Sequence, residues 1–331
     1  MRSPPFNLHS PTTVAEAVQI SADLFSQGKD SDWIAGGTDL LPNYKWHLNP
    51  KNDVISLSNV ADLEVNSANE IGAMVRLSTI SQADETHPLI ASAAGQVASS
   101  LIRNNATLGG NICLDTRCFW FNQGEDWRSS IDWCLKCDCG TSADCRVIPN
   151  QNELCVATYQ ADIAPTLMVL NATIHLAGPE GERQMPISKF FQLDGITRNV
   201  LQRGEMVVKV TLPEDADQWH GSYQKLSLRE SWDFPEAGVA VAWRKNADGS
   251  LAELRVATTA LESIPRLHET EVASVMNQGW EGEKSIISLS EAIQMTVKPV
   301  NNTAFPPNYR KKMTKVLCQR ALRQMNSGEY I

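Results

Sequence analysis

The spacing of the cysteines is the strongest chemical signal in this sequence. Seven of the eight cysteines lie in one 43-residue window, from Cys113 to Cys155, and four fall within the stretch CLKCDCGTSADC at 134–145. A secreted disulfide scaffold would be small and would spread its cysteines along the chain, and disulfides are disfavoured in a reducing cytosol. The pattern therefore predicts that several of these thiols bind a metal. Cys318, in a helical pattern, and Cys113, after an apolar residue, are better interpreted as packed thiols.

The composition bounds the class of protein. The chain has 331 residues, 42% of them hydrophobic, and a formal net charge of −9. This length allows two or three domains with separate cores. The negative charge disfavours a nucleic-acid partner and favours a small ligand or a protein. The N-terminal stretch MRSPPFNLHSPTT has no apolar signal segment, and no stretch approaches the roughly 18 apolar residues of a membrane span, so we expect a cytoplasmic protein.

The elements that must position this chemistry alternate between helical and extended patterns. A helix is predicted within 11–28, strands over 31–34 and 53–60, and a helix over 81–103. Further strands are predicted over 164–178, 205–213, 223–231, 237–245 and 252–263, followed by a helix over 309–328. These elements predict an α+β protein in three parts, 1–57, 58–216 and 217–331, with the cysteine-rich insert at about 113–156 in the second.

Two glycine turns follow apolar elements, AGGTD at 35–39 and TLGGN at 107–111. Adjacent glycines allow unusual backbone conformations and let a ligand approach the backbone N–H groups. Successive N–H groups can bind anionic oxygen, so two such turns facing each other could hold the two phosphates of a dinucleotide. Neither turn matches G-x-G-x-x-G or the Walker A pattern, which disfavours Rossmann and ATPase interpretations.

Four motifs occur in a characteristic order: AGGTDLL at 35–41, ATLGGNI at 106–112, ATYQADIAPTLMVLNA at 157–172 and SYQKLSLRESWDFPEAGVAVA at 222–242. Together they resemble the FAD-binding medium subunits of the molybdenum hydroxylase (xanthine oxidase) family over nearly the whole chain. The resemblance implies a two-part FAD-binding domain of the vanillyl-alcohol-oxidase/CO-dehydrogenase-flavoprotein type, followed by a C-terminal α+β domain. In that family the glycine loops cradle the FAD pyrophosphate, an aspartate contacts the nucleotide and a lysine lies by the flavin.

Carried over to this sequence, the resemblance implies FAD contacts from Ala35, Gly36, Gly37, Thr38, Asp39, Leu40, Thr107, Gly109, Gly110, Asn111, Asp162 and Lys225. Two of these residues have simpler interpretations. Asp162 could cap a helix or turn that begins at Ala164-Pro165, and Lys225 could be a solvated lysine on a strand.

The insert, CLDTRCFWFNQGEDWRSSIDWCLKCDCGTSADCRVIPNQNELC at 113–155, resembles the corresponding region of the beta subunits of 4-hydroxybenzoyl-CoA reductases. A loop insertion there holds an extra [4Fe-4S] cluster, which requires four thiolates. The alignment implies ligation by Cys118, Cys134, Cys145 and Cys155, with Cys137 or Cys139 as substitutes for Cys145.

Zinc is the alternative metal. Cys134 and Cys137 form a C-x₂-C pair that could complete a tetrahedral site with Cys145 and Cys155. Spacing alone leaves both metals open. The insert is rich in aromatic residues, which suit either an apolar wall around a cluster or a small packed core: Phe119, Trp120, Phe121, Trp127 and Trp133.

The resemblance implies an electron-transfer subunit, because FAD exchanges electrons singly or in pairs while an iron–sulfur cluster passes one at a time. The partners would be a molybdenum-cofactor large subunit, a [2Fe-2S] small subunit and a donor such as ferredoxin, and the reaction would be reductive dehydroxylation of 4-hydroxybenzoyl-CoA. The alternatives are an FAD subunit passing electrons from an aromatic or heterocyclic substrate to NAD or another acceptor, and a zinc-stabilised binding module. The six histidines are scattered, so we predict no catalytic acid, base or nucleophile here.

Overall fold

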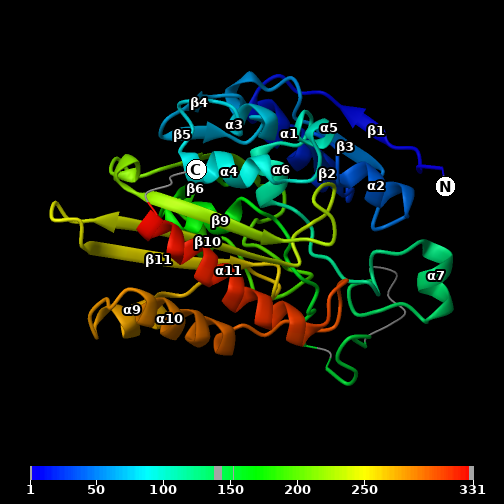
Figure 1. Cartoon of the computed structure of the whole chain (residues 1–331). Coiled ribbons are helices and arrows are strands. Elements are labelled where there is room, and N and C mark those ends of the chain that lie inside the picture. The colour runs from blue at the N-terminus through cyan, green and yellow to red at the C-terminus, as the bar shows by residue number, and fades with distance from the viewer. Residues whose placement is uncertain (1, 138–143, 152, 328–331) are drawn as a thin grey trace.

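Three separate β-sheets organise the chain (Figure 1). The computed structural model describes residues 2–137, 144–151 and 153–327. Each sheet lies within one of the three parts expected from the sequence, although the boundaries between those parts stay a prediction. Within the described ranges, no helix is long and apolar enough to cross a membrane.

The first sheet is small and parallel, in the order β1-β3-β2, with β1 at Asn7–His9, β2 at Ser31–Ile34 and β3 at Asp53–Ser56. The helix α1 (Val14–Ser26) connects β1 to β2, and Thr13 caps it by accepting a hydrogen bond from the backbone N–H of Glu16. After β2 the chain passes through the first glycine turn into the short helix α2 (Leu40–Lys45). The turn therefore lies at the carboxyl edge of a parallel sheet, where α/β proteins commonly bind ligands.

The second sheet has five antiparallel strands in the order β4-β5-β8-β6-β7. Its strands are β4 (Asn66–Ser67), β5 (Glu70–Gly72), β6 (Thr173–Gly178), β7 (Gly181–Pro186) and β8 (Met206–Thr211). Between β5 and β6 the chain forms the short helices α3 (Leu77–Ile80), α4 (Pro88–Gly95), α5 (Ser100–Arg103), α6 (Leu108–Ile112), α7 (Glu125–Ser130) and α8 (Ala164–Val169). The second glycine turn begins α6, so both glycine turns start a short helix.

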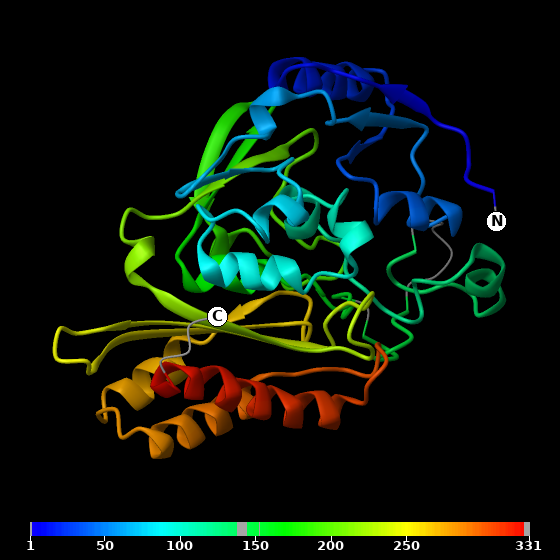
Figure 2. The same ribbon diagram turned by 45° about the horizontal axis from the view of Figure 1, so that its top comes forward.

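The third sheet is antiparallel, in the order β12-β11-β10-β9, and it is covered on both faces (Figure 2). Its strands are β9 (His220–Leu226), β10 (Ala237–Lys245), β11 (Leu251–Thr259) and β12 (Arg266–Leu267), followed by α9 (Glu269–Met276), α10 (Glu283–Thr296) and α11 (Pro307–Ser327). Along β10, Val239, Val241 and Trp243 pack with α10 and α11. The alternate residues Ala240 and Ala242 pack toward α4 and α8. This period of two buries both faces of the strand.

The cysteine-rich insert lies beside α2, away from the second sheet that its flanking segments join (Figure 1). It has a small core, in which Phe121 packs with Cys118, Cys134, Cys155 and with Leu48, three residues after α2. Arg128 of α7 fastens the insert to the same region, since its guanidinium donates a 2.8 Å hydrogen bond to the carbonyl oxygen of His47.

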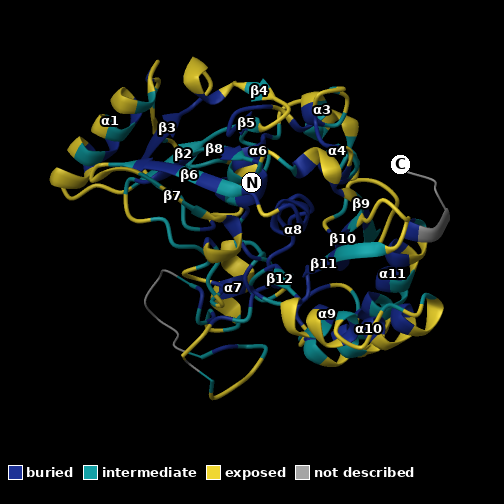
Figure 3. Cartoon of the chain, turned by 90° about the vertical axis from the view of Figure 1, so that its left-hand side faces the viewer, coloured by how far each residue is buried: buried dark blue, intermediate teal, exposed yellow. Residues whose placement is uncertain are grey.

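The structure corrects three sequence predictions. The strand predicted over 223–231 ends earlier, because β9 ends at Leu226. The segment 81–103 does not form one helix, because Pro88 starts α4, Ala98 has a positive φ of 43°, and Ser99 caps the separate helix α5. The segment 164–178 is not one strand. Its first part is α8, which Figure 3 shows as buried, and Asn171 with φ 54° separates it from β6. Pro165 near the start of α8 favours this helix. The helices α9 and α10 were not predicted.

A buried histidine makes the stability of the third part depend on pH. His268 precedes α9, is 1% exposed, and shares a 2.9 Å hydrogen bond with Thr258. Burial lowers the pKa of His268 from 6.5 to about 4. The unfolded chain therefore takes up a proton near pH 6.5 while the folded chain does not. The contribution of neutral His268 to the unfolding free energy is therefore fully present above pH 6.5 and is lost as the pH falls toward 4.

We expect His268→Gln to reduce the loss of unfolding free energy between pH 7 and 5 by about 2 kcal/mol, since one pH unit of difference corresponds to about 1.4 kcal/mol. Urea unfolding at the two pH values measures this loss. His220→Gln, at an exposed position of β9, is the control. If the His268 variant loses as much unfolding free energy between pH 7 and 5 as the wild type, His268 is not the group responsible.

Candidate functional site

A cavity of about 730 Å³ collects the predicted FAD residues. Its walls include all six predicted residues of the first glycine turn, all four of the second, and Asp162. Lys225 is outside that lining set but is bonded to Asp162. The volume lies within the roughly 300–1,000 Å³ typical of small-molecule and cofactor sites. The fold thus brings together residues that are separated by as much as 190 positions in the sequence, from Ala35 to Lys225.

The two glycine turns are in direct contact. A Cβ atom on Gly36 would overlap the backbone carbonyl oxygen of Asn105, which lies two residues before the second turn. Gly37 has φ 67°, in the region that favours glycine. On the other side, a Cβ atom on Gly110 would lie 4.0 Å from the Cβ of Ala35. The glycines therefore permit two backbone segments to approach each other at the cavity wall.

The side chains of the second turn fix its conformation. Thr107 accepts a 3.2 Å hydrogen bond from the backbone N–H of Gly110 and caps α6. The side-chain oxygen of Asn111 accepts a 3.3 Å bond from the backbone N–H of Ile163. Asn111 therefore links this turn to the segment that carries Asp162, and the FAD cavity is assembled by contacts between distant motifs.

Asp162 and Lys225 form a buried ion pair, which excludes the simpler interpretations of both residues. The Lys225 ammonium lies 3.0 Å from the Asp162 carboxylate, and their side chains are 7% and 3% exposed. Tyr223 donates a 2.9 Å hydrogen bond to the same carboxylate. Burial raises the pKa of Asp162, and Lys225 and Tyr223 oppose that shift. The N-cap of α8 is Ile163, so Asp162 is not the capping residue.

Because both charges are buried, we expect Asp162→Asn to lower the unfolding free energy by about 3–5 kcal/mol, as is typical when one partner of a buried pair is removed. The double variant Asp162→Asn with Lys225→Met removes both charges and should be more stable than Asp162→Asn alone. Denaturant unfolding of the FAD-depleted chain measures both values. If adding Lys225→Met destabilises the Asp162 variant further, the two groups are not energetically coupled in this way.

Basic residues that sequence reasoning missed also line this cavity. Arg117 forms an ion pair with Asp39 of the first glycine turn and lies 4.7 Å above the ring of Phe234. Arg198 forms a 3.5 Å ion pair with Asp115. Burial lowers the pKa of Arg117 to about 10, with a further contribution from Arg198, so the group stays cationic at neutral pH. The sequence signal for Arg117 was its position directly before the predicted ligand Cys118, in a protein with a negative net charge.

The donor chemistry of the cavity fits an anionic dinucleotide. The Nε atoms of both Arg117 and Arg198 are buried without a hydrogen-bond partner among the described residues. A buried guanidinium N–H without a partner is costly unless a ligand accepts from it. A bound FAD supplies phosphate and flavin oxygens of the required kind, so the residues present fit this cofactor.

Four cysteines surround a second, smaller cavity next to the first. Cys118, Cys134, Cys145 and Cys155 all line it, and their exposure is between 5% and 8%. These are the four residues that the resemblance implies as ligands. Apolar side chains complete the wall, including Trp120, Phe121, Leu135 and Val147.

Burial disfavours the thiolate form of the cysteines in this small cavity. Burial raises the pKa of Cys118 to about 12 and that of Cys155 to about 11, and the pKa of Cys134 is also raised by burial. The neighbouring cysteines add to each of these shifts. Thiols of this kind become thiolates when a metal centre replaces their protons. The donor set is therefore chemically suited to an iron–sulfur cluster or a metal ion.

The other cysteines differ in position. Cys137 takes part in a disulfide bond, while Cys145 is a free thiol in the small cavity. Cys139, the second proposed substitute, lies outside the described residues. Cys113 lines the FAD cavity, and Cys318 is buried in the core formed by the third sheet and its helices.

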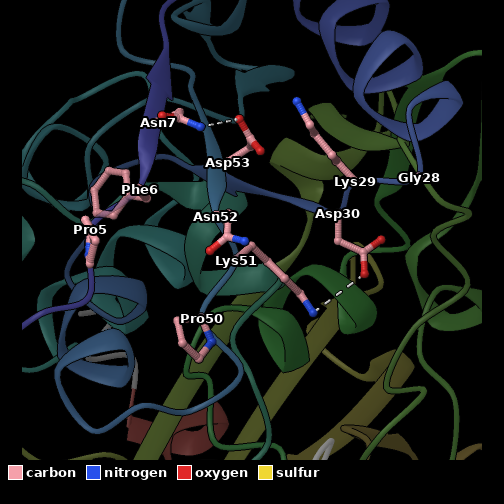
Figure 4. A pocket seen from close by; sticks show the side chains of 10 residues that line it. All are labelled: Pro5, Phe6, Asn7, Gly28, Lys29, Asp30, Pro50, Lys51, Asn52 and Asp53. Atoms are coloured by element: carbon pink, nitrogen blue, oxygen red, sulfur yellow. Dashed lines mark hydrogen bonds and ion pairs between the residues drawn. The ribbon is translucent and has the colours of Figure 1, made fainter.

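A third cavity, of about 680 Å³, lies at the starts of β1 and β3 (Figure 4). None of the predicted site residues lines it. Two of its contacts are between lining residues: Asp53 accepts a 3.2 Å hydrogen bond from Asn7, and the Lys51 ammonium lies 3.8 Å from Asp30. The predicted chemistry is therefore concentrated in the other two cavities.

Comparisons with known proteins identify the family. The family described as the FAD binding domain in molybdopterin dehydrogenase matches residues 4–215. The chain is 30% identical over 234 residues to an aldehyde oxidoreductase FAD-binding subunit of Escherichia coli, covering 66% of this chain and 73% of that one. It is 26% identical to the carbon monoxide dehydrogenase medium chain of Hydrogenophaga pseudoflava, covering 97% of each.

The fold is also that of solved relatives. The reconstituted CO dehydrogenase of Oligotropha carboxidovorans contains a chain that matches with a TM-score of 0.77 and 21% identity, over 99% of both chains. The predicted α+β FAD-binding fold is therefore confirmed. This chain belongs to the family of FAD-binding domains in molybdopterin dehydrogenases, and it is the FAD subunit of an oxidoreductase of the molybdenum hydroxylase type.

Proposed function

We propose that this chain is a flavo-iron-sulfur electron-transfer subunit in which Cys118, Cys134, Cys145 and Cys155 hold a [4Fe-4S] cluster. The observation that supports this most strongly is that the four buried thiols come from separate stretches of the insert and line one cavity. A [4Fe-4S] cluster takes one thiolate for each of its four irons. The twelve predicted residues would hold FAD. Ten of them lie in the two glycine turns, and the other two are the ion pair of Asp162 and Lys225.

The apolar walls around the thiols support a cluster over a single zinc ion. Zinc needs four sulfurs within about 2.3 Å of one point, whereas a cluster needs them spread around a larger group. Among the described residues, no three or more His, Cys, Asp or Glu side chains are grouped so that they could hold a metal ion. The four thiols line a cavity whose walls limit access of water to a redox centre.

The cofactors would supply the conversion between one-electron and two-electron transfer. The chain's own residues bind and separate the two centres: the glycine turns and arginines surround one cavity and the cysteines the other. Both cavities share wall residues, so the two centres would be close neighbours. The substrate would be transformed on another subunit, as the resemblance implies.

We propose that the partners are a molybdenum-cofactor large subunit and a [2Fe-2S] small subunit, with ferredoxin or a similar low-potential donor. The insert supports the reductive dehydroxylation of 4-hydroxybenzoyl-CoA as the reaction of the complex, because it resembles the corresponding reductase region. A cytoplasmic location agrees with four reduced ligand cysteines.

A second candidate is the FAD subunit of a hydroxylase that passes electrons from an aromatic or heterocyclic substrate to NAD or another acceptor. The relatives favour it, since they include a protein named as the nicotine 6-hydroxylase medium subunit and one named as a xanthine dehydrogenase FAD-binding subunit.

Two anaerobic measurements test these proposals, one on the isolated chain and one on the purified complex. Iron, acid-labile sulfide and zinc analysis of the isolated chain, with a spectrum before and after dithionite, tests the cluster; stoichiometric zinc without a bleachable iron absorption would exclude it. Turnover of 4-hydroxybenzoyl-CoA with reduced ferredoxin, compared with turnover of purines or other heterocycles with NAD, separates the two reactions. Activity only with the second set would favour the hydroxylase.

A further inference from the structure

Lys136 and Phe121 form a wall between the two cavities. Each residue lines both the FAD cavity and the four-cysteine cavity. Phe121 is 2% exposed, and the Lys136 ammonium lies 4.8 Å from the centroid of its ring. The ammonium of Lys136 therefore places a positive charge at the boundary between the two predicted redox centres.

The position of this cation is fixed by three acceptors. The Lys136 ammonium donates to the Asp115 carboxylate at 2.8 Å, to the Thr116 carbonyl oxygen at 3.0 Å and to the Thr116 hydroxyl at 2.6 Å. An ammonium has three N–H donors, so each can find a partner here. Thr116 in turn donates to the carbonyl oxygen of Gly195 at 2.6 Å, which holds the hydroxyl in place. The Lys136 side chain is 6% exposed.

Lys136 shares its carboxylate partner with a second cation, because Arg198 also lies 3.5 Å from the same oxygen of Asp115. Arg198 interacts in addition with Asp32, and the nearby Arg117 pairs with Asp39. The carboxylate of Asp115 therefore pairs with two cations, so it does not compensate the charge of Lys136 alone. Water screens this charge weakly because Lys136 is buried.

We propose that Lys136 raises the reduction potential of the cluster held by the four cysteines. This inference rests on the proposed function. When a donor such as reduced ferredoxin gives up one electron, the cluster gains one negative charge, and a fixed cation nearby stabilises that reduced form. The charge of the surroundings is one of the properties by which a protein sets a cluster potential. Lys136 acts through its charge and binds no reacting atom.

The test is an anaerobic redox titration of the full complex, in which the reduced cluster is followed by EPR. We expect Lys136→Met to shift the one-electron reduction equilibrium about tenfold toward the oxidised form, which is about 59 mV for a one-electron couple. Lys136→Arg keeps the charge and should retain most of the wild-type potential. Lys284→Met removes an exposed ammonium on α10 and serves as the control, with no expected shift.

Asp115→Asn provides an independent test of opposite sign. It removes the carboxylate and leaves Lys136, so it should shift the equilibrium toward the reduced form. If Lys136→Met fails to assemble the cluster, the reduction potential of the Asp115→Asn variant tests the proposal instead.

A potential that is unchanged in both variants, or that moves in the opposite direction in either, would overturn the role of Lys136 while leaving the cluster established by its iron and EPR signal. If the isolated wild-type chain contains no iron, the proposed function is refuted, and this inference with it.

Discussion

Replacing Cys145 with alanine is expected to leave the purified chain with no intact [4Fe-4S] cluster. Each of the four thiolates holds one iron, and Cys145 is the predicted ligand in the middle of the insert. Wild-type protein should contain about four iron and four sulfide atoms per chain, and the variant should lose the dithionite-bleachable absorption. The same loss is expected for each of the single variants Cys118→Ala, Cys134→Ala and Cys155→Ala, because each removes the thiolate of one iron.

Cys318→Ala is the matched control, because this cysteine is equally buried but lies in α11, in the core of the third part. It should keep full iron and sulfide content. Cys137→Ala and Cys139→Ala test the two alternatives, since either cysteine was predicted as a substitute for Cys145. Full iron in Cys145→Ala together with loss in Cys137→Ala or Cys139→Ala would show that the ligand set is assigned wrongly. The FAD content of all variants indicates whether the rest of the chain has folded.

Replacing Gly36 with alanine is expected to abolish stable FAD binding. The added methyl group would overlap the backbone carbonyl of Asn105, so the two glycine turns must separate. Separation withdraws N–H groups from the cofactor. Since each hydrogen bond to a charged group contributes about 1.5–3 kcal/mol, the loss of two weakens binding roughly 100-fold or more.

Titration of the deflavinated chain with FAD, followed by the quenching of flavin fluorescence, measures this effect. Gly95→Ala is the control, because its new methyl group would lie 3.8 Å from Ser81, an ordinary contact in α4. Iron content and circular dichroism report on the fold of both variants. Wild-type affinity in a folded Gly36 variant would contradict the role assigned to the contact between the turns.

Much of the fold could be predicted from local patterns. The strand before the first glycine turn, the alternating strand β10 and the long final helix follow from periodicity, because each period matches one regular backbone geometry. The predictions over 81–103 and 164–178 were wrong where Pro88, Ala98 and Asn171 interrupt the pattern. Apolar content alone does not distinguish a short buried helix such as α8 from a strand.

The sequence by itself determined the inventory of this protein: cysteines concentrated in one insert, two glycine turns, and an ordered set of motifs that indicates the family. Only the tertiary structure decided which of these groups meet. It places Cys145 rather than the disulfide-bonded Cys137 with the other three thiols, and it encloses Lys136 and Arg117 between distant segments. The physical reason is that burial and charge pairing depend on contacts between residues far apart in the chain, such as Arg117 with Asp39, which local spacing does not encode.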